Sequence, residues 1–169
     1  MEISIKLIVL ITGIILTGLT AGLCFTWGNA VTPGIGKLDD LGFLQSFQEM
    51  NRAIINPTFL VVFMGPVLLH VANVFLFKNA PGQVWFLILT AAVLYFVGLF
   101  LVTILGNVPL NEMLDKTDLI KANANELATL REQFEAPWNR LHNIRTISTV
   151  LSTILLTLSL WLSAKGMNI

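Results

Sequence analysis

The sequence has few charged residues and almost no cysteine. Asp, Glu, Lys and Arg make up 12% of its 169 residues, whereas about a quarter of an average soluble domain is charged. This shortage excludes an ordinary soluble protein. Cys24 is the single cysteine, so an intramolecular disulfide is impossible, and we interpret it as a small buried apolar residue. Basic and acidic residues number ten each, which leaves no basic stripe and excludes nucleic acid as a partner.

The signature motifs of several enzyme classes are also missing. The chain has no Gly-x-Ser-x-Gly elbow, no phosphate loop and no dinucleotide fingerprint. It has no cysteine cluster, and we expect His70 and His142 to lie on the order of 20 Å apart along the helices. A zinc site or a two-histidine iron site therefore cannot be assembled from this chain alone. We expect neither a metal site nor a cofactor; haem held by a single histidine stays open, although no feature favours it.

Long apolar runs dominate the sequence. Hydrophobic residues make up 55% of the chain and the mean hydropathy is +0.78. The runs reach the roughly 20 residues that cross about 30 Å of hydrocarbon. They predict an all-α integral membrane four-helix bundle, a single domain of residues 1–169, with spans at about 3–27, 57–77, 84–106 and 139–164. The first run is too long for a signal peptide and lacks a small-x-small cleavage site, so we expect it to be retained.

The connections carry turn and helix signals. Residues 28–42, rich in glycine, predict a loop. Residues 43–55 predict an amphipathic helix before span two, where Asn56 suits an N-cap and Pro57 the first helical position. Residues 78–82 predict a tight turn between spans two and three.

The connection before span four is predicted to be a second helix outside the bundle. Gly106 and Pro109 predict a break after span three. Asn111 can cap a new helix over residues 111–134, whose apolar residues recur at helical spacing. We expect this longer helix to be extramembrane or to lie in the membrane interface.

Four spans place both termini on one side of the membrane and the two long connections on the other, the loop side. Three basic residues, Lys6, Lys78 and Lys165, lie on the terminal side and seven on the loop side. By the positive-inside rule, this count alone predicts that the loop side faces the cytoplasm. However, the loop side also holds nine of the ten acidic residues, and a lysine before the first span is typical of an N-in anchor. We favour a bacterial inner membrane protein with cytoplasmic termini.

Polar residues gather at the loop-side ends of the spans. Trp138, His142 and Arg145 are spaced i, i+4 and i+7, which puts them on one helix face. An interfacial tryptophan and a snorkelling arginine would explain two of them taken alone, but their coincidence with His142 favours a functional face. The exit of span one, Trp27-Gly-Asn29, should lie at the same mouth of the bundle.

Each polar residue in the connections also has a structural explanation. Asn107 and Asn111 could satisfy backbone groups freed by a helix break, Glu112 could complement a helix dipole, and Glu49 could pair with Arg52. Their convergence nevertheless predicts a small-molecule pocket. The predicted catalytic residues are His142, Arg145 and Asn107, and the predicted substrate-binding residues are Glu49, Asn51, Arg52, Asn111, Glu112, Trp138 and Asn143.

His70 lies inside span two and is interpreted separately. Thr12, Thr90 and Thr157 should lie at about its depth in the other spans. An intramembrane histidine is often functional, yet a layer of hydroxyl and imidazole groups that satisfy one another between helices is the simpler explanation.

Three groups of residues carry a likeness to a known family: Glu49-Met-Asn-Arg52 with Asn56-Pro-Thr-Phe59, then Gly106-Asn-Val-Pro-Leu-Asn-Glu112, and then Trp138 with Asn143 and Arg145. On these residues the sequence resembles, over nearly its whole length, the anthrone oxygenase-like family of small four-span membrane proteins. The resemblance implies the fold more directly than the activity. Characterised relatives oxidise polyketide anthrones to anthraquinones without an evident cofactor. That chemistry would use His142 as the base, Arg145 with Asn107 or Asn111 to hold an oxyanion, and Trp138 as a flat wall.

A non-enzymatic function is the alternative. A membrane bundle of this kind could bind a lipid, a quinone-like molecule or a partner protein. The segment Gly18-Leu-Thr-Ala-Gly22 presents small residues four apart, which permits close helix contact inside the bundle or between protomers of a homo-oligomer. The expected partners are therefore membrane lipid and a small hydrophobic or aromatic molecule. A transporter is less favoured because the chain has no internal repeat.

Overall fold

The computed structural model describes residues 4–166, and every regular element in that range is a helix. Three elements, named η, are π-helical, with wider turns than an α-helix. The elements in chain order are α1 (Ile5–Thr26), η1 (Trp27–Val31), α2 (Thr32–Ile35), α3 (Asp40–Ile54), α4 (Pro57–Leu76), α5 (Gly82–Val93), η2 (Leu94–Leu101), η3 (Thr103–Asn107), α6 (Val108–Asp115) and α7 (Ala124–Gly166).

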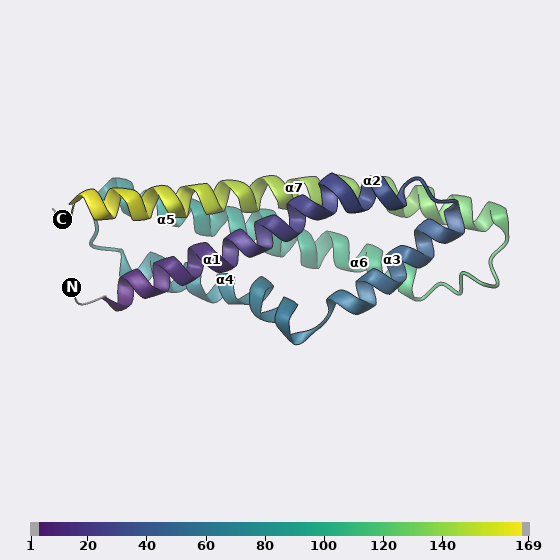
Figure 1. Ribbon diagram of the computed structural model, residues 1–169, viewed down its shortest axis with the longest axis horizontal. Coiled ribbons are helices and arrows are strands. Elements are labelled where there is room, and N and C mark those ends of the chain that lie inside the picture. The colour runs from purple at the N-terminus through teal and green to yellow at the C-terminus, as the bar shows by residue number, and fades with distance from the viewer. Residues whose placement is uncertain (1–3, 167–169) are drawn as a thin grey trace.

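Four helical rods are long and apolar enough to cross a membrane. They cover Ile5–Ile35, Pro57–Leu76, Gly82–Asp115 and Ala124–Lys165, so the predicted all-α chain with four membrane spans is confirmed at this level. The start of α1 and the end of α7 lie at the same end of the bundle (Figure 1). The predicted start of span one at residue 3, and the chain ends 1–3 and 167–169, lie outside the described residues.

Three of the rods are much longer than a membrane requires. The rod that contains span four has 42 residues, which corresponds to about 60 Å at 1.5 Å per residue. The extra length carries these rods beyond the start of α4, at the end of the bundle away from the start of α1 (Figure 1). There α2, α3, α6 and the first third of α7 form a headpiece, defined here as residues 32–54 and 108–138.

The predicted loop at residues 28–42 is wrong over most of its length. The first rod stays helical as far as Ile35, and only residues 36–39 connect it to α3. Glycine lowers helix propensity by about 1 kcal/mol per residue, but here π-helical η1 and the first turn of α2 absorb the irregularity. Pro33 lies in that first turn, directly after η1.

The predicted break after span three is also wrong. Helical structure continues from η3 straight into α6, so Asn111 lies inside a helix and does not cap one. Pro109 occupies the first turn of α6. A proline ring clashes with the carbonyl four residues earlier, and the wider turn of η3 just before Pro109 accommodates this clash.

The prediction of one helix over residues 111–134 is wrong, because two helices, α6 and α7, share this segment. Residues 116–123 are not helical, and α7 begins at Ala124 and continues without interruption through Pro137 into span four. Asn123 starts α7 as a capping box: its Oδ1 accepts from the Glu126 N–H at 3.1 Å while its own N–H donates to the Glu126 carboxylate at 2.8 Å. The apolar pattern of the segment therefore belongs to two helices of one headpiece.

Other local predictions are confirmed. Helix α3 coincides closely with the predicted amphipathic helix. Asn56 caps α4, with its Oδ1 accepting from the Phe59 N–H at 3.0 Å, and Pro57 is the first residue of that helix. A short turn at residues 77–81 joins α4 to α5.

The rods approach one another closely where small residues meet. A Cβ added at Gly98 would collide with Ser148, so glycine at that position allows η2 to lie directly against α7. A Cβ added at Gly18 would contact Thr153 at 3.7 Å. Gly18 is thus turned toward α7 inside the bundle, whereas Gly22 is exposed and an added Cβ there would have no atom within 4 Å.

The headpiece has its own core. It is built from aromatic and leucine side chains of α3, α6, the connection after it and α7: Phe43, Leu44, Phe47, Leu114, Leu119, Leu127, Phe134 and Trp138. Two separate apolar clusters lie deeper in the bundle, between the spans. The headpiece core is therefore distinct from the apolar clusters between the spans.

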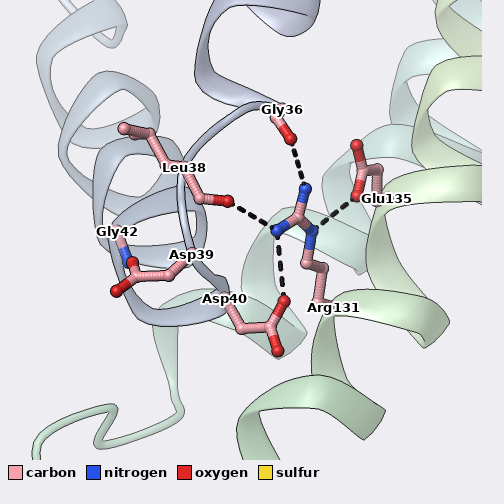
Figure 2. A network of polar contacts seen from close by, with 7 residues as sticks. All are labelled: Gly36, Leu38, Asp39, Asp40, Gly42, Arg131 and Glu135. Atoms are coloured by element: carbon pink, nitrogen blue, oxygen red, sulfur yellow. Dashed lines mark hydrogen bonds and ion pairs between the residues drawn. The ribbon is translucent and has the colours of Figure 1, made fainter.

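Arg131 joins the first connection to α7 (Figure 2). Its guanidinium donates to the carbonyls of Gly36 and Leu38 at 2.8 and 2.9 Å and forms ion pairs with Asp40 at 3.1 Å and Glu135 at 2.7 Å. It also lies 4.4 Å above the centre of the Phe43 ring. Only 17% of the side chain is exposed, so these contacts are much stronger than those of a surface ion pair.

Replacing Arg131 by lysine should destabilise the headpiece. An ammonium group cannot make four directed hydrogen bonds in one plane, and we expect a loss of about 1–3 kcal/mol, seen as a fall of several degrees in Tm in detergent. The matched control is Arg140→Lys on an exposed residue of the same helix. Equal Tm values for the two variants would contradict this role for Arg131.

His70 is buried between the spans, but its partners differ from those predicted. Its Nε2 lies 3.3 Å from Thr17 Oγ1 and 3.4 Å from Ser152 Oγ. The predicted layer of Thr12, Thr90 and Thr157 is wrong: Thr12 is exposed, and the hydroxyls of the other two bond to carbonyls of their own helices. Which threonines face inward depends on how each helix is rotated about its own axis. This rotation cannot be inferred from the depth of a residue along the bundle.

Two substitutions separate a structural role of His70 from a ligand-binding role. His70→Gln keeps a hydrogen-bonding group for Thr17 and Ser152 and should leave Tm close to that of the wild type. His70→Leu removes this group from a dry layer and should cost about 1–3 kcal/mol. Thermal melts of the two purified variants test this, and equal stability, or a metal found on His70, would refute it.

Candidate functional site

A cavity of about 330 Å³ lies where the headpiece meets the membrane spans. All four rods and α3 contribute to its wall. Its polar or aromatic lining includes seven predicted site residues, namely Asn51, Arg52, Asn111, Glu112, Trp138, His142 and Arg145. The rest of the wall is mainly apolar and comes from Leu23, Ile54, Ile55, Phe59, Phe63 and Val108, with Thr20, Cys24, Trp27, Thr103 and Asp115 between them.

The predicted helix face Trp138, His142 and Arg145 lines one wall of the cavity. The rings of Trp138 and His142 are stacked, with centroids 4.9 Å apart and an angle of 12° between their planes. The Arg145 guanidinium lies 5.1 Å from the centre of the Trp138 ring. These contacts present a flat, partly cationic surface to anything in the cavity.

Two asparagines fix Trp138 in place. The indole N–H donates to Asn111 Oδ1 at 2.8 Å, and Asn107 Nδ2 donates to the Trp138 carbonyl at 3.3 Å. Asn111 lies in the cavity wall, whereas Asn107 is fully buried behind it. Both residues therefore position the aromatic wall.

Both ring nitrogens of His142 have partners. Arg145 Nη2 lies 2.8 Å from Nδ1, and since arginine only donates, Nδ1 must be the acceptor. Nε2 lies 2.9 Å from the Cys24 carbonyl oxygen and therefore carries the proton. The ring is a neutral imidazole with a defined tautomer.

A glycine and a π-helix allow the histidine to approach α1. A Cβ at Gly28 would lie 3.4 Å from two atoms of the His142 ring, at the short end of ordinary van der Waals contact. Gly28 belongs to η1, the π-helical segment that begins just after the Cys24 turn. π-Helical turns inside longer helices are frequent at functional sites, and this one forms part of the cavity wall.

Arg145 is a cation without an acidic partner among residues 4–166. Its remaining contact is a long one, 3.4 Å from Nη1 to the Thr103 hydroxyl, and its buried Nε has no hydrogen-bond partner in the described part of the chain. Taking a charge out of water is costly unless it is paired. An anionic or strongly polar oxygen in the cavity would supply that pairing.

The outer rim of the cavity carries paired charges. Arg52 donates to Asp115 at 2.8 Å and to Glu49 at 2.7 Å, as the sequence suggested for the second pair. The hydrogen bond that Arg52 donates to Asp115 is the main cause that raises the pKa of Arg52 above its ordinary value. Glu112 pairs with Lys116 at 3.2 Å. All of these side chains are at least half exposed, so their ion pairs contribute little to stability.

Three predicted site residues lie outside the cavity wall. Glu49 is bound to Arg52 on the outside of α3, Asn107 lies behind Trp138, and Asn143 is exposed on another face of α7. Conversely, Cys24, Thr103 and the apolar wall residues were not predicted, because a residue within an apolar run gives no sign of which way it faces.

No other feature of the described residues competes with this cavity as a site. A shallow hollow of about 390 Å³ lies over the start of α7, between exposed polar side chains such as Asn123 and Gln133. Residues 4–166 contain no group of three or more His, Cys, Asp or Glu side chains placed to hold a metal ion.

Comparison with known proteins gives one match. A search of curated proteins finds none similar to this chain. A search of solved structures also finds none. The family model described as anthrone oxygenase matches residues 58–155, more than half of the chain and a stretch that includes Trp138, His142 and Arg145. The chain belongs to the anthrone oxygenase family.

Proposed function

We propose that this protein is a cofactor-independent membrane oxygenase that oxidises an anthrone-like aromatic compound in the cavity beneath the headpiece. The observation that carries the proposal is Arg145, a half-buried cation with no acidic partner among the described residues, lying against the stacked rings of Trp138 and His142. Family membership supports the same chemistry.

The lining of the cavity suits a flat substrate that becomes an anion. Loss of a proton from the methylene carbon of an anthrone gives a carbanion whose charge is spread onto the ring oxygen as a phenolate. Arg145 would pair with that oxygen, and a guanidinium already in place stabilises charge as it develops. Trp138 and Phe59 would lie against the ring system within an otherwise apolar wall.

His142 is the proposed base. Its Nδ1 lone pair accepts from Arg145 at 2.8 Å, so it is occupied until Arg145 turns toward the substrate oxygen. Binding of the substrate would thus release Nδ1 next to the acidic C–H. The Nε2–H bond to the Cys24 carbonyl keeps the ring in the orientation and tautomer that a base requires.

The reaction balances with dioxygen as the only oxidant. The carbanion adds to dioxygen and takes back a proton, which gives a hydroperoxide at the former methylene carbon. Removal of the second C–H proton then breaks the O–O bond and forms the new carbonyl, with release of water. One oxygen atom thus enters the anthraquinone and the other leaves as water.

The other predicted residues receive supporting roles. Asn111 and Asn107 hold Trp138, and Asn51 offers an amide to the substrate from α3. Arg52 and Glu112 line the entrance, where Glu49 keeps Arg52 in place. We assign no contact with substrate to Asn143.

Oxygen uptake by the detergent-purified protein with anthrone as substrate tests the proposal. His142→Ala removes the base and should lower the rate at least about a hundredfold. Arg145→Lys should lower it at least about tenfold, because an ammonium cannot replace a planar two-pronged donor.

Two comparisons make this experiment decisive. Arg140→Lys, on an exposed residue of the same helix, should keep the wild-type rate, and Tm values confirm that the variants are folded. Wild-type uptake no faster than that of anthrone in buffer would end the oxygenase proposal. Uptake unchanged in folded His142→Ala would end the role of His142.

We also propose that the protein lies in a bacterial inner membrane with its termini in the cytoplasm. Lys6 ahead of the first span supports this orientation. Four of the loop-side cations, Arg52, Lys116, Lys121 and Arg131, are ion-paired with acids.

Thiol labelling in right-side-out spheroplasts tests the orientation. A membrane-impermeant maleimide should label Lys121→Cys, on the loop side, but should not label Lys78→Cys, on the turn beside the termini. The wild type, whose Cys24 is buried, is the blank. The opposite labelling pattern would reverse the orientation.

A further inference from the structure

The exposed residues in the cavity wall mark where the cavity opens. Four of the lining residues are exposed, namely Arg52, Ile55, Glu112 and Asp115, and the others are buried or half-buried. Arg52 lies in the last turn of α3, Ile55 lies at the corner between α3 and α4, and the two acidic residues lie in α6. These four residues define the mouth of the cavity, between the end of α3 and α6.

The mouth lies at the boundary of the membrane. Helix α4 has 20 residues, which corresponds to about 30 Å and just crosses the hydrocarbon of a bilayer. Its first residue, Pro57, therefore lies at the edge of the hydrocarbon, two residues after Ile55. On the third rod, Leu105 is 73% exposed, as a residue facing lipid would be, whereas Glu112 is charged and exposed two turns later. The boundary thus crosses both rods beside the mouth.

The aqueous edge of the mouth is tied shut. Arg52 donates from α3 to Asp115 of α6 at 2.8 Å, directly across the mouth. Farther from the membrane, the buried Gln48 side chain donates to the carbonyls of Leu114 and Thr117 at 2.7 and 3.0 Å. A ligand that came from water would have to break or bypass these bonds.

The membrane edge of the mouth is apolar. Ile55, which is 71% exposed, and Phe59 form it. Helix α4 packs against α1 and α5, and the corner where it begins lies apart from α6 and α7 (Figure 1). Deeper in the membrane, Phe63 and Phe100 fill the seam between α4 and η2, with ring centroids 6.4 Å apart. A molecule in the bilayer therefore meets the cavity at Ile55 and Phe59, between that seam and the aqueous edge.

We propose that a flat aromatic ligand dissolved in the bilayer enters the cavity sideways, over Ile55 and Phe59, while the bonds between α3 and α6 keep the aqueous edge closed. Apolar molecules gather in hydrocarbon because water disfavours their surface. An entrance on the membrane edge receives them without a passage through water. The inference rests on the proposed function for the class of ligand, and adds to it the route and the residues that control entry.

Blocking one edge at a time tests the route. Ile55→Cys and Glu112→Cys place a thiol on the membrane edge and on the aqueous edge, and each variant would be measured before and after reaction with N-benzylmaleimide. The probe is 9,10-anthraquinone, which has no C–H left to oxidise at the reacting carbon, delivered from preloaded vesicles to the protein in lipid nanodiscs. Its arrival would be followed by quenching of tryptophan fluorescence, because Trp27 and Trp138 line the cavity.

Two controls accompany these variants. The wild type, whose Cys24 is buried, shows whether the reagent acts without an added thiol. Ile120→Cys carries the same modification on an exposed isoleucine of the headpiece, outside the cavity wall. Neither control should change its rates by more than about twofold on treatment. Each variant is compared with itself before modification, so differences in folding do not enter the result.

Modification of Ile55→Cys should slow binding and release of anthraquinone together, each at least about fivefold, and should change the Kd by less than about twofold. A group that only narrows an entrance lowers both rates equally, whereas a group that touches the bound ligand or disturbs the fold changes the Kd. Modification of Glu112→Cys should slow the two rates much less, because the ligand does not cross the aqueous edge.

The outcomes separate this inference from the oxygenase proposal. Unchanged rates in modified Ile55→Cys, a change in Kd alone, or no saturable quenching in the wild type would overturn the route. Slowing by modified Glu112→Cys as large as that by modified Ile55→Cys would also overturn it and would indicate entry from water. Oxygen uptake by the wild type alongside any of these results would leave the oxygenase proposal standing. Entry controlled by Ile55 in a protein without oxygen uptake would support the route and end the oxygenase proposal.

Discussion

Helix α7 is the element on which the rest of the molecule depends. It runs without a break from the headpiece to the end of span four, and α1, α3, α5, α6 and all three π-helical segments pack against it. Pro137 has no N–H, so the carbonyl of Gln133 loses its helical hydrogen bond. The helix tolerates this loss because Gln133 is an exposed residue of the headpiece, where water can replace the bond. One helix thus fixes the headpiece, the cavity and the membrane spans relative to one another.

The π-helical turns adapt two other rods to the site. In the first rod η1 lies where Gly28 meets the His142 ring, and in the third η3 ends at Asn107, two residues before Pro109. Wider turns change the rotation of everything that follows along a helix. Backbone groups inside a membrane must form hydrogen bonds within the protein, and the π-helical turns keep these bonds in both rods. The first rod at the same time turns Trp27 toward the cavity, and the third places Asn107 behind Trp138.

The cavity and the headpiece use arginine in opposite ways. Arg131 is surrounded by two carboxylates and two carbonyls (Figure 2), so its charge is satisfied within the protein and its role is structural. Arg145 has a hydroxyl, a histidine nitrogen and an aromatic face as neighbours, which leaves its charge available to a ligand. Burial alone does not distinguish the two, whereas the chemistry of the acceptors does.

The sequence by itself determined the four spans, the all-helical class, the amphipathic helix α3, the cap at Asn56 and the face of Trp138, His142 and Arg145. Each of these follows from local composition or from spacing along one helix. Only the tertiary structure decided that glycine and proline at residues 28–36 and 106–109 do not end their helices, because packing outweighs local propensity. It alone also showed which side of each apolar rod faces the cavity, since a uniformly apolar helix has no pattern to reveal its rotation. For this reason Cys24, Thr103 and the partners of His70 could not be predicted.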